Sequence, residues 1–328
     1  KVWTDTEVIH YPSHGILPYE RKDIDPSILQ QRLTTISKLN QHKNQDPPLI
    51  ITSIQSLGSH TLPQKDFKKA LTTISLNQEV NLDLFIKKII SIGYKQELVV
   101  TNSGEFAHRG GIVDLFSPLA IHPVRIEFFG NVIDSIRTFN PVDQRTVQHE
   151  TKITFGPASE WIPTSSEIAN FAYNNSNVST EKSLNELADL KNGYLTTPSF
   201  YGPLLSKKTL LDYIPSNSLI IFDEMNEIDL IASEQDELSS ERKILLIKNG
   251  DLDPKTPESH MNKKKLFKEL KKYSKTIELN RWSSKLDKKH IRLPFSQSKS
   301  FSGKLNLAAQ DFSKRKNKNH HSLVITEQ

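Results

Sequence analysis

Residues 103–145 read SGEFAHRGGIVDLFSPLAIHPVRIEFFGNVIDSIRTFNPVDQR, and this stretch decides the fold of the middle of the chain. Its centre, residues 124–129 (VRIEFF), has the composition of a strand. Alternate side chains of a strand point to opposite faces, so the three apolar residues at even positions form a core face. The opposite face carries Arg125, Glu127 and Phe129.

Phe129 has no apolar neighbour on its own face of that strand. An exposed aromatic ring beside an arginine is typical of a protein-binding hot spot. With Arg109, the two residues Arg125 and Phe129 then form a patch in which the ring is the anchor and the arginines bind carboxylates. Alternatively, Arg125 and Glu127 are solvated strand residues and Phe129 packs under a loop. The pattern leaves both open.

The surrounding residues predict a compact α+β domain over 67–158. Asn81 or Asp83 can cap a helix that stops near Gly93. Gly130-Asn131 predicts a tight hairpin turn, and Gly110-Gly111 supplies a positive φ or a close backbone approach. Besides 124–129, strands are expected at 97–101, 111–116 and about 132–139.

The flanking residues predict an α/β arrangement. The apolar spacing in 27–39 predicts a helix, and residues 49–52 and 219–224 predict buried strands, the second covered on both faces as in a parallel sheet. Residues 261–273 predict a helix with Leu266, Leu270 and Tyr273 inward. The stretch 296–320 is polar and predicts partial disorder, and 322–326 resembles the start of a strand.

The 328 residues allow two or three domains. No segment predicts a membrane span or a signal peptide, and the lack of cysteine excludes disulfides and thiol catalysis, so we expect a cytoplasmic protein. The chain begins at Lys1 rather than methionine, as a fragment or a processed chain does. Its net charge of +5 is uneven, with −8 in residues 1–240 and +13 from 241 onward. A basic region of this kind either binds nucleic acid or is a solvated lysine-rich surface.

The chain shows little chemistry of its own. Asp223 and Glu224 end a strand as a Mg²⁺-binding Walker B element does, but the phosphate loop G-x-x-x-x-G-K-[ST] is absent from the sequence. The eleven histidines do not have metal-ligand spacing, and no nucleophile signature occurs. We expect no catalytic residue, no metal site and no cofactor.

The 103–145 run resembles the signature of the bacterial transcription-repair coupling factors (Mfd), in the domain that they share with the excision-repair protein UvrB. The motifs LPYE (17–20), QRL (31–33), PASE (157–160) and LDYIP (211–215) are similar to further family segments. RGGI and NPVDQRT favour the coupling factors over UvrB, whose tyrosine-rich DNA hairpin has no match here.

This resemblance implies a split RecA-like α/β domain, without a P-loop, into which an α+β UvrA-binding domain is inserted. The first lobe covers 1–66 with its beginning missing, the inserted domain 67–158 and the second lobe 159–320, and 321–328 begin a linker or a further domain. The family's UvrA-binding residues match Arg109, Arg125 and Phe129. Asp223 and Glu224 match a degenerate Walker B site that does not hydrolyse ATP.

The resemblance therefore implies a module for transcription-coupled nucleotide excision repair that recruits UvrA, or holds that surface masked by other domains of a longer protein. It lacks the ATP-dependent DNA translocase motor of the family and is not itself an enzyme. Two alternatives stay open: a UvrB-like ATPase or helicase fragment that uses Asp223 and Glu224, and a DNA-binding module that uses the basic 241–320 region.

Overall fold

The computed structural model describes residues 5–41, 48–281, 291 and 305–316. It divides into two compact units, Lys1–Asn280 and Arg281–Gln328. The second unit contains one helix among its described residues, α10 (Leu305–Lys316), which lies in a stretch that the sequence predicted as partly disordered. The strand predicted at 322–326 lies outside the described residues.

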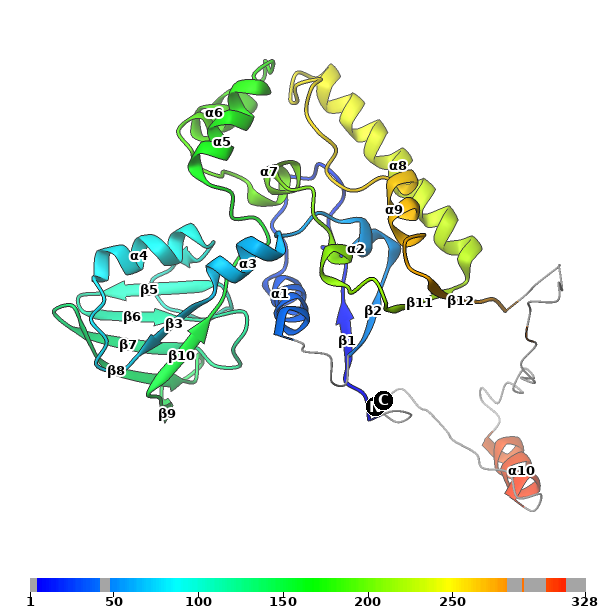
Figure 1. The fold of residues 1–328 in the computed structure, drawn as a ribbon, viewed down its shortest axis with the longest axis horizontal. Coiled ribbons are helices and arrows are strands. Elements are labelled where there is room, and N and C mark those ends of the chain that lie inside the picture. Colours follow the sequence, from blue (N-terminus) through cyan, green and yellow to red (C-terminus); the bar gives the residue numbers. More distant parts are fainter. Residues whose placement is uncertain (1–4, 42–47, 282–290, 292–304, 317–328) are drawn as a thin grey trace. The chain divides into compact units, whose positions relative to one another are not determined.

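Residues 95–149 form a six-stranded sheet, which lies at the left in Figure 1. Its order is β4-β5-β6-β7-β8-β9, and all neighbours are antiparallel except β4 and β5. The strands are β4 (Lys95–Gln96), β5 (Glu105–Arg109), β6 (Ile112–Leu115), β7 (Val124–Phe129), β8 (Val132–Phe139) and β9 (Thr146–His149). Gly130-Asn131 joins β7 to β8 as predicted, with Gly130 at φ +62°.

Helix α4 (Leu82–Ser91) covers one face of this sheet, together with the antiparallel pair β3 (Thr72–Ser75) and β10 (Lys152–Phe155). Asn81 caps α4 by accepting the N–H of Leu84, and the helix ends just before Gly93, which has φ +97°. The predicted inward face of β7 is confirmed, because Val124, Ile126 and Phe128 all pack in this core. We call this side the inner face of the sheet.

The strand predicted at 97–101 is wrong. Val100 is buried against the opposite, outer face of the sheet, where it packs with Ala107, Phe116 and Phe139. The carboxylate of Glu105 accepts the N–H groups of residues 101 and 102, both at 2.8 Å. The segment therefore satisfies backbone donors through a side chain rather than through a strand ladder.

A bulge interrupts the hairpin of β7 and β8. Glu127 pairs with Ser135 whereas Phe128 pairs with Ile133, so Asp134 is an extra residue on β8. Ile133 and Ile136 are consequently both buried on the inner face although they lie three positions apart.

The α/β part contains two separate pairs of parallel strands. One pair is β1 (Val8–Tyr11) with β2 (Leu49–Thr52), and the other is β11 (Leu219–Asp223) with β12 (Lys275–Leu279). A shared core includes residues of β1, β2 and β11 and of five helices: α1 (Pro26–Gln41), α2 (Ile54–Gly58), α3 (Gln64–Ala70), α8 (Met225–Lys248) and α9 (Lys263–Leu270). The 3₁₀ helix Leu210–Tyr213 completes it.

Two details of this part differ from the sequence predictions. The strands at 49–52 and 219–223 are not covered on both faces, because Ile51 is 53 % and Leu219 50 % exposed. Their alternate residues pack in the core, while these two point to a face that no described segment buries. The helix predicted at 261–273 is shorter, since Asn262 caps α9 and the helix ends at Leu270; the three predicted inward residues are nevertheless buried.

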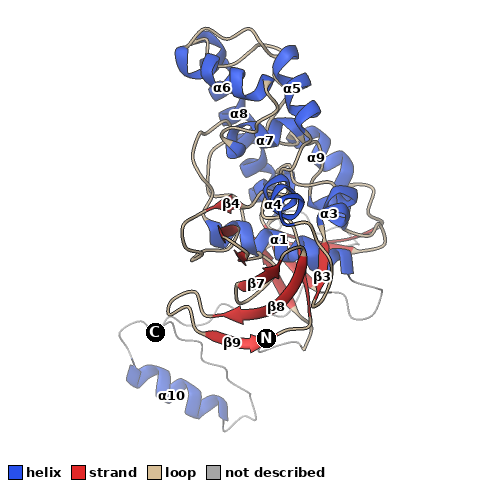
Figure 2. Ribbon diagram, turned by 90° about the vertical axis from the view of Figure 1, so that its left-hand side faces the viewer, coloured by secondary structure: helices blue, strands red, loops and turns tan. Residues whose placement is uncertain are grey.

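A third core is formed mainly by α5 (Ser165–Asn174), α6 (Glu181–Lys191) and α7 (Pro198–Leu205), which lie close together in Figure 2. The core on the inner face of the sheet draws its buried residues from Ala70 to Ala158. The first unit is thus a mixed α/β structure with several cores. The domain limits given above stay predictions.

Candidate functional site

The strand register brings the three predicted site residues to the outer face of the sheet. Arg109 lies opposite Ile112, which lies opposite Glu127 on the next strand. Phe129 lies opposite Val132 across the hairpin. Residues directly opposite one another share a face, and so do residues two positions apart on one strand. Arg109, Arg125 and Phe129 therefore share the outer face.

Arg125 is already paired within the domain. Its Nε donates to Asp114 Oδ1 at 2.6 Å and its Nη2 to Asp114 Oδ2 at 2.7 Å. Nη2 also donates to Gln144 at 3.1 Å, and the guanidinium carbon lies 4.7 Å from the centre of the Phe139 ring. The hydrogen bonds that Arg125 donates to Asp114 raise the pKa of Arg125. The part of the outer face around Arg125 is therefore covered by the small core of Val100, Ala107, Phe116 and Phe139 and by the ion pair of Arg125 with Asp114.

Glu127 is also paired. Arg137 donates to its carboxylate at 2.6 Å and Ser135 at 3.0 Å. Partial burial opposes ionisation of Glu127, but these two hydrogen bonds outweigh it and the pKa lies below its ordinary value. The acidic residue between Arg125 and Phe129 is therefore a fixed carboxylate with its own cation.

Phe129 is 82 % exposed, which excludes the interpretation that it packs under a loop. The backbone beneath the ring is held on both sides. The N–H of Phe128 donates to the carbonyl of Gly111 at 2.7 Å, and the N–H of Val80 donates to the carbonyl of Asn131 at 2.6 Å. A large apolar ring is thus exposed to solvent on a hairpin whose backbone is hydrogen-bonded on both sides.

Arg109 is exposed at the end of β5, and its Nη2 donates to the carbonyl oxygen of Leu98. Leu98 itself is 86 % exposed. Ile112 and Val132, the ladder partners in this region, are each about two-fifths exposed. We call the five residues of this open half the tip patch: Leu98, Arg109, Ile112, Phe129 and Val132.

The sequence did not predict three members of the tip patch. Ile112 and Val132 follow from the alternation of their strands once the hairpin register is known. No pattern in the sequence predicted an exposed Leu98, and the segment that contains it was wrongly predicted as a strand. The sequence also did not predict the ion pair between Asp114 and Arg125, because the cross-strand pairing that brings them together is visible only in the structure.

The two glycines of the RGG corner serve the two purposes that were expected of the pair. Gly110 has φ +58°, in the left-handed region that favours glycine. At Gly111 a Cβ atom would lie 2.6 Å from the carbonyl oxygen of Phe128. The corner therefore lets β6 approach the strand that ends in Phe129.

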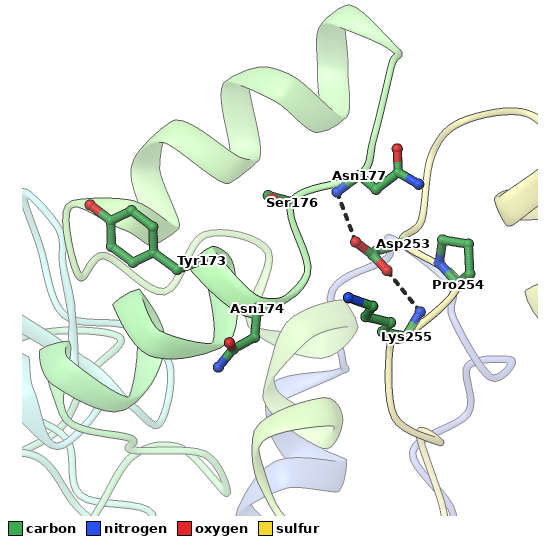
Figure 3. A pocket seen from close by; sticks show the side chains of 7 residues that line it. All are labelled: Tyr173, Asn174, Ser176, Asn177, Asp253, Pro254 and Lys255. Carbon is green, nitrogen blue, oxygen red and sulfur yellow. Dashed lines mark hydrogen bonds between the residues drawn. The ribbon is translucent and has the colours of Figure 1, made fainter.

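The described residues contain no group of three or more His, Asp or Glu side chains arranged to hold a metal ion. Glu224 lies at the end of β11 in a left-handed conformation, with φ +60°, and α8 begins directly after it. A cavity of about 300 Å³ lies between Tyr173 and Lys255 (Figure 3). Asp253 in its wall already accepts the N–H groups of Asn177 and Lys255.

A Ser–His–Asp cluster occurs on α8 and the loop before α9. Ser239 Oγ lies 3.5 Å from Nδ1 of His260, whose Nε2 lies 3.1 Å from Asp236. Ser239 is 1 % exposed, so no substrate reaches its hydroxyl. Asp236 also accepts the N–H of Lys263 at 2.9 Å, which makes this cluster a structural tie between the two helices.

The family model described as the UvrB interaction domain matches residues 72–161. This match includes the whole six-stranded sheet and the tip patch. Because of this match we refer to residues 72–161 as the UvrB interaction domain. The domain thus carries its exposed aromatic ring on the side of the sheet opposite its main core.

The chain is also homologous to transcription-repair-coupling factors. It is 31 % identical over 244 residues to that of Staphylococcus epidermidis, an alignment that covers 68 % of this chain and 20 % of the relative. The coupling factor of Staphylococcus aureus is 30 % identical over 242 residues, with the same coverage. The chain thus spans about a fifth of the length of these relatives. In the described part of the chain, no helix is both long and apolar enough to cross a membrane.

Proposed function

We propose that this chain is a docking module that binds UvrA through the tip patch and thereby recruits excision repair to stalled transcription. The observation that carries the proposal is the exposed ring of Phe129 in a UvrB interaction domain. The similarity to transcription-repair-coupling factors supports the link to transcription.

The tip patch has the properties of a small binding hot spot. Its aromatic anchor stands on a backbone that is fixed before binding, so little conformational entropy is lost when a partner covers it. Leu98, Ile112 and Val132 add exposed apolar side chains to the patch, which a partner can cover together with the anchor. Arg109 supplies a cation at the rim for a carboxylate of the partner.

Arg125 has a second role in this proposal. Its ion pair with Asp114 fixes the outer face beside the tip patch, and its exposed edge adds positive charge toward the partner. Of the three predicted site residues, Phe129 then supplies the aromatic anchor, Arg109 a cation at the edge of the patch and Arg125 a cation that supports the patch from beside it.

The rest of the chain is, in this proposal, a split RecA-like α/β body without a P-loop, interrupted by the UvrB interaction domain. The parallel pairs β1–β2 and β11–β12 and their helices support it. Asp223 and Glu224 hold no nucleotide, because the sequence contains no phosphate loop. The module recruits a partner and does not itself hydrolyse ATP or move DNA.

The test is the affinity of this chain for purified UvrA, measured by biolayer interferometry. Phe129→Ala should weaken binding by about 2 kcal/mol or more, roughly 30-fold. Its fold should remain, since the ring packs in no core. Val142→Ala is the matched control, because Val142 is 92 % exposed in the same domain outside the tip patch. Equal affinities of the parent and Phe129→Ala would reject the site.

A further inference from the structure

The chain leaves the UvrB interaction domain through a short step from one core to another. Ala158 is buried in the core of the sheet, and its N–H donates to the carbonyl of Ile92 at 2.9 Å. Glu160, two residues later, is fully buried among residues of the α/β part. The last residues of the domain are therefore fixed within three positions, Ala158 in the core of the sheet and Glu160 in the α/β part.

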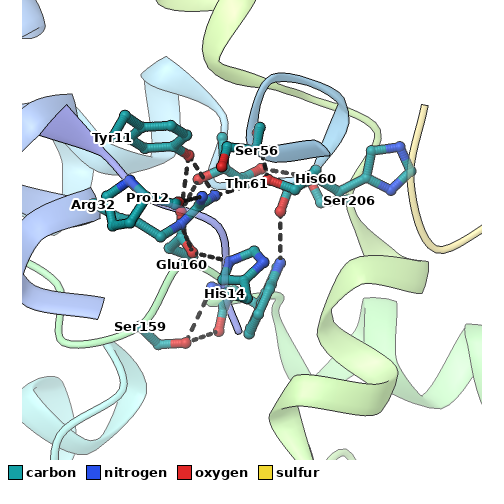
Figure 4. Close-up of polar contacts among 12 residues, drawn as sticks. Tyr11, Pro12, His14, Arg32, Ser56, His60, Thr61, Ser159, Glu160 and Ser206 are labelled. Carbon is teal, nitrogen blue, oxygen red and sulfur yellow. Dashed lines mark hydrogen bonds and ion pairs between the residues drawn. The ribbon is translucent and has the colours of Figure 1, made fainter. Parts of the chain in front are cut away.

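Four side chains of the α/β part donate to the Glu160 carboxylate (Figure 4). Arg32 Nε lies 2.8 Å and His14 Nε2 2.5 Å from Oε2. Thr61 Oγ1 lies 2.7 Å and Tyr11 Oη 3.2 Å from Oε1. Tyr11 and His14 lie at and just after the end of β1, Arg32 lies on α1 and Thr61 follows α2, so one carboxylate joins three separate pieces of chain.

Arg32 is fully buried as well, and its other N–H groups are used. Nη1 donates to the carbonyl of Pro12 at 2.7 Å and Nη2 to Ser59 at 2.9 Å, while the guanidinium stacks 4.0 Å from the Tyr11 ring centre. Burial alone would make both charges costly. Their mutual attraction dominates, raising the pKa of Arg32 and lowering that of Glu160.

The entrance to the domain has weaker ties. Helix α3 places Phe67 in the core of the α/β part and Ala70 in the core of the sheet. From α1, Thr34 donates to the carbonyl of Pro118 at 3.1 Å. These contacts leave the buried Glu160 cluster as the strongest polar connection across the junction.

We propose that Glu160 is a positioning residue that fixes the direction in which the UvrB interaction domain presents the tip patch to the partner. A buried ion pair is weak evidence for stability, because apolar residues stabilise such sites equally well, whereas its directed bonds define one geometry. With the cluster broken, the domain turns about the links near Pro63 and Ala158. The identity of the partner at the tip patch depends on the proposed function. The role of Glu160 in fixing the orientation of the domain does not.

The absence of cysteine allows a direct test in the whole chain. Leu84→Cys on α4 and Leu230→Cys on α8, 65 % and 57 % exposed in the parent, carry spin labels for a distance measurement by pulsed electron paramagnetic resonance. The parent should give one narrow distance distribution, and Glu160→Gln should roughly double its width as rigid-body freedom is gained. UvrA affinity should stay within about twofold, because the tip patch is untouched.

Glu186→Gln is the matched control. Glu186 is a mostly buried carboxylate that pairs with Arg21 at 3.0 Å and accepts a bond from Tyr201 at 2.8 Å, away from the junction. Its loss should leave the distribution narrow. If circular dichroism shows that Glu160→Gln does not fold, Thr61→Val combined with Tyr11→Phe removes two donors, keeps the ion pair and should broaden the distribution.

A folded junction variant with the narrow distribution of the parent would overturn the proposal. Equal broadening in Glu186→Gln would overturn it too, since the effect would then be general loosening. Failure of the parent to bind UvrA would instead reject the proposed function and leave the positioning role intact.

Discussion

Arg125 and Asp114 face each other on neighbouring strands and share two parallel hydrogen bonds, at 2.6 and 2.7 Å. Their side chains are 22 % and 13 % exposed, so the pair is largely shielded from water. A bidentate pair of this kind fixes both partners in direction as well as distance. The arginine that the sequence placed on an open charged face is thus part of the framework beside the exposed ring.

Arg125→Ala should lower the free energy of unfolding by about 1–3 kcal/mol, because the largely buried carboxylate of Asp114 loses its cation. Urea denaturation measures this. Arg145→Ala, in the same domain with a side chain that is 86 % exposed, should change stability by less than about 0.5 kcal/mol. If Arg125→Ala and Arg145→Ala lowered the free energy of unfolding equally, the ion pair of Arg125 with Asp114 would not stabilise the sheet.

Leu98→Ala should weaken UvrA binding by about 1 kcal/mol, since it removes apolar surface beside the Arg109 rim. Ile121→Ala is the control, because Ile121 is as exposed, at 87 %, but lies outside the tip patch. Isothermal titration calorimetry of both variants separates them. If Leu98→Ala binds like the parent while Phe129→Ala does not, the patch is smaller than we infer.

Gly111→Ala should destabilise the domain more than Gly110→Ala. The added Cβ at Gly111 meets the carbonyl oxygen of Phe128 at 2.6 Å, and backbone must shift to relieve it. At Gly110 nothing lies within 4 Å, so only the positive φ opposes alanine, at about 1 kcal/mol. We expect a loss of roughly 2–4 kcal/mol at Gly111 in thermal unfolding. The reverse order would contradict the close approach.

Acid should destabilise the chain in two steps. Burial and the nearby Arg32 lower the pKa of His14 below its ordinary 6.5. Burial opposes ionisation of Glu160, but the Arg32 cation and the hydrogen bonds from Arg32 and His14 lower the pKa of Glu160 below 4.5. In both cases the unfolded chain binds protons that the folded chain does not, so stability falls as pH decreases. The losses should begin near pH 6.5 and steepen below pH 4.5.

Urea unfolding between about pH 8 and pH 2 measures this dependence. His14→Gln should flatten part of the upper step. The remaining part belongs to His60, whose pKa burial also lowers. An upper step of unchanged size in His14→Gln would assign it to other groups.

Local sequence patterns predicted the elements around the tip patch well. The alternation in 124–129, the Gly130-Asn131 turn, the Asn81 cap and the stop before Gly93 all concern neighbouring residues, and the structure confirms them. Local patterns gave wrong predictions where the conformation of a segment depends on residues far from it in the sequence. Residues 97–101 are not a strand because Val100 packs on the outer face and Glu105 captures the backbone.

The parallel strands show the same limit. The apolar run at 219–224 predicted burial on both faces and the run at 49–52 predicted a buried strand, but a run does not specify what lies over each face, and Ile51 and Leu219 are half-exposed. The clearest case is Glu160, which the sequence marked only through the PASE motif. Its partners Tyr11 and Arg32 lie 149 and 128 positions away.

The sequence by itself therefore determined which residues of the hairpin face the core and that Phe129 lies opposite them, because strand periodicity is a property of adjacent residues. The tertiary structure alone decided that the ring is exposed, that Arg125 is held by Asp114, and that Glu160 joins the domain to its body. Exposure and ion pairing depend on which distant segments pack nearby, and periodicity along one strand carries no information about them.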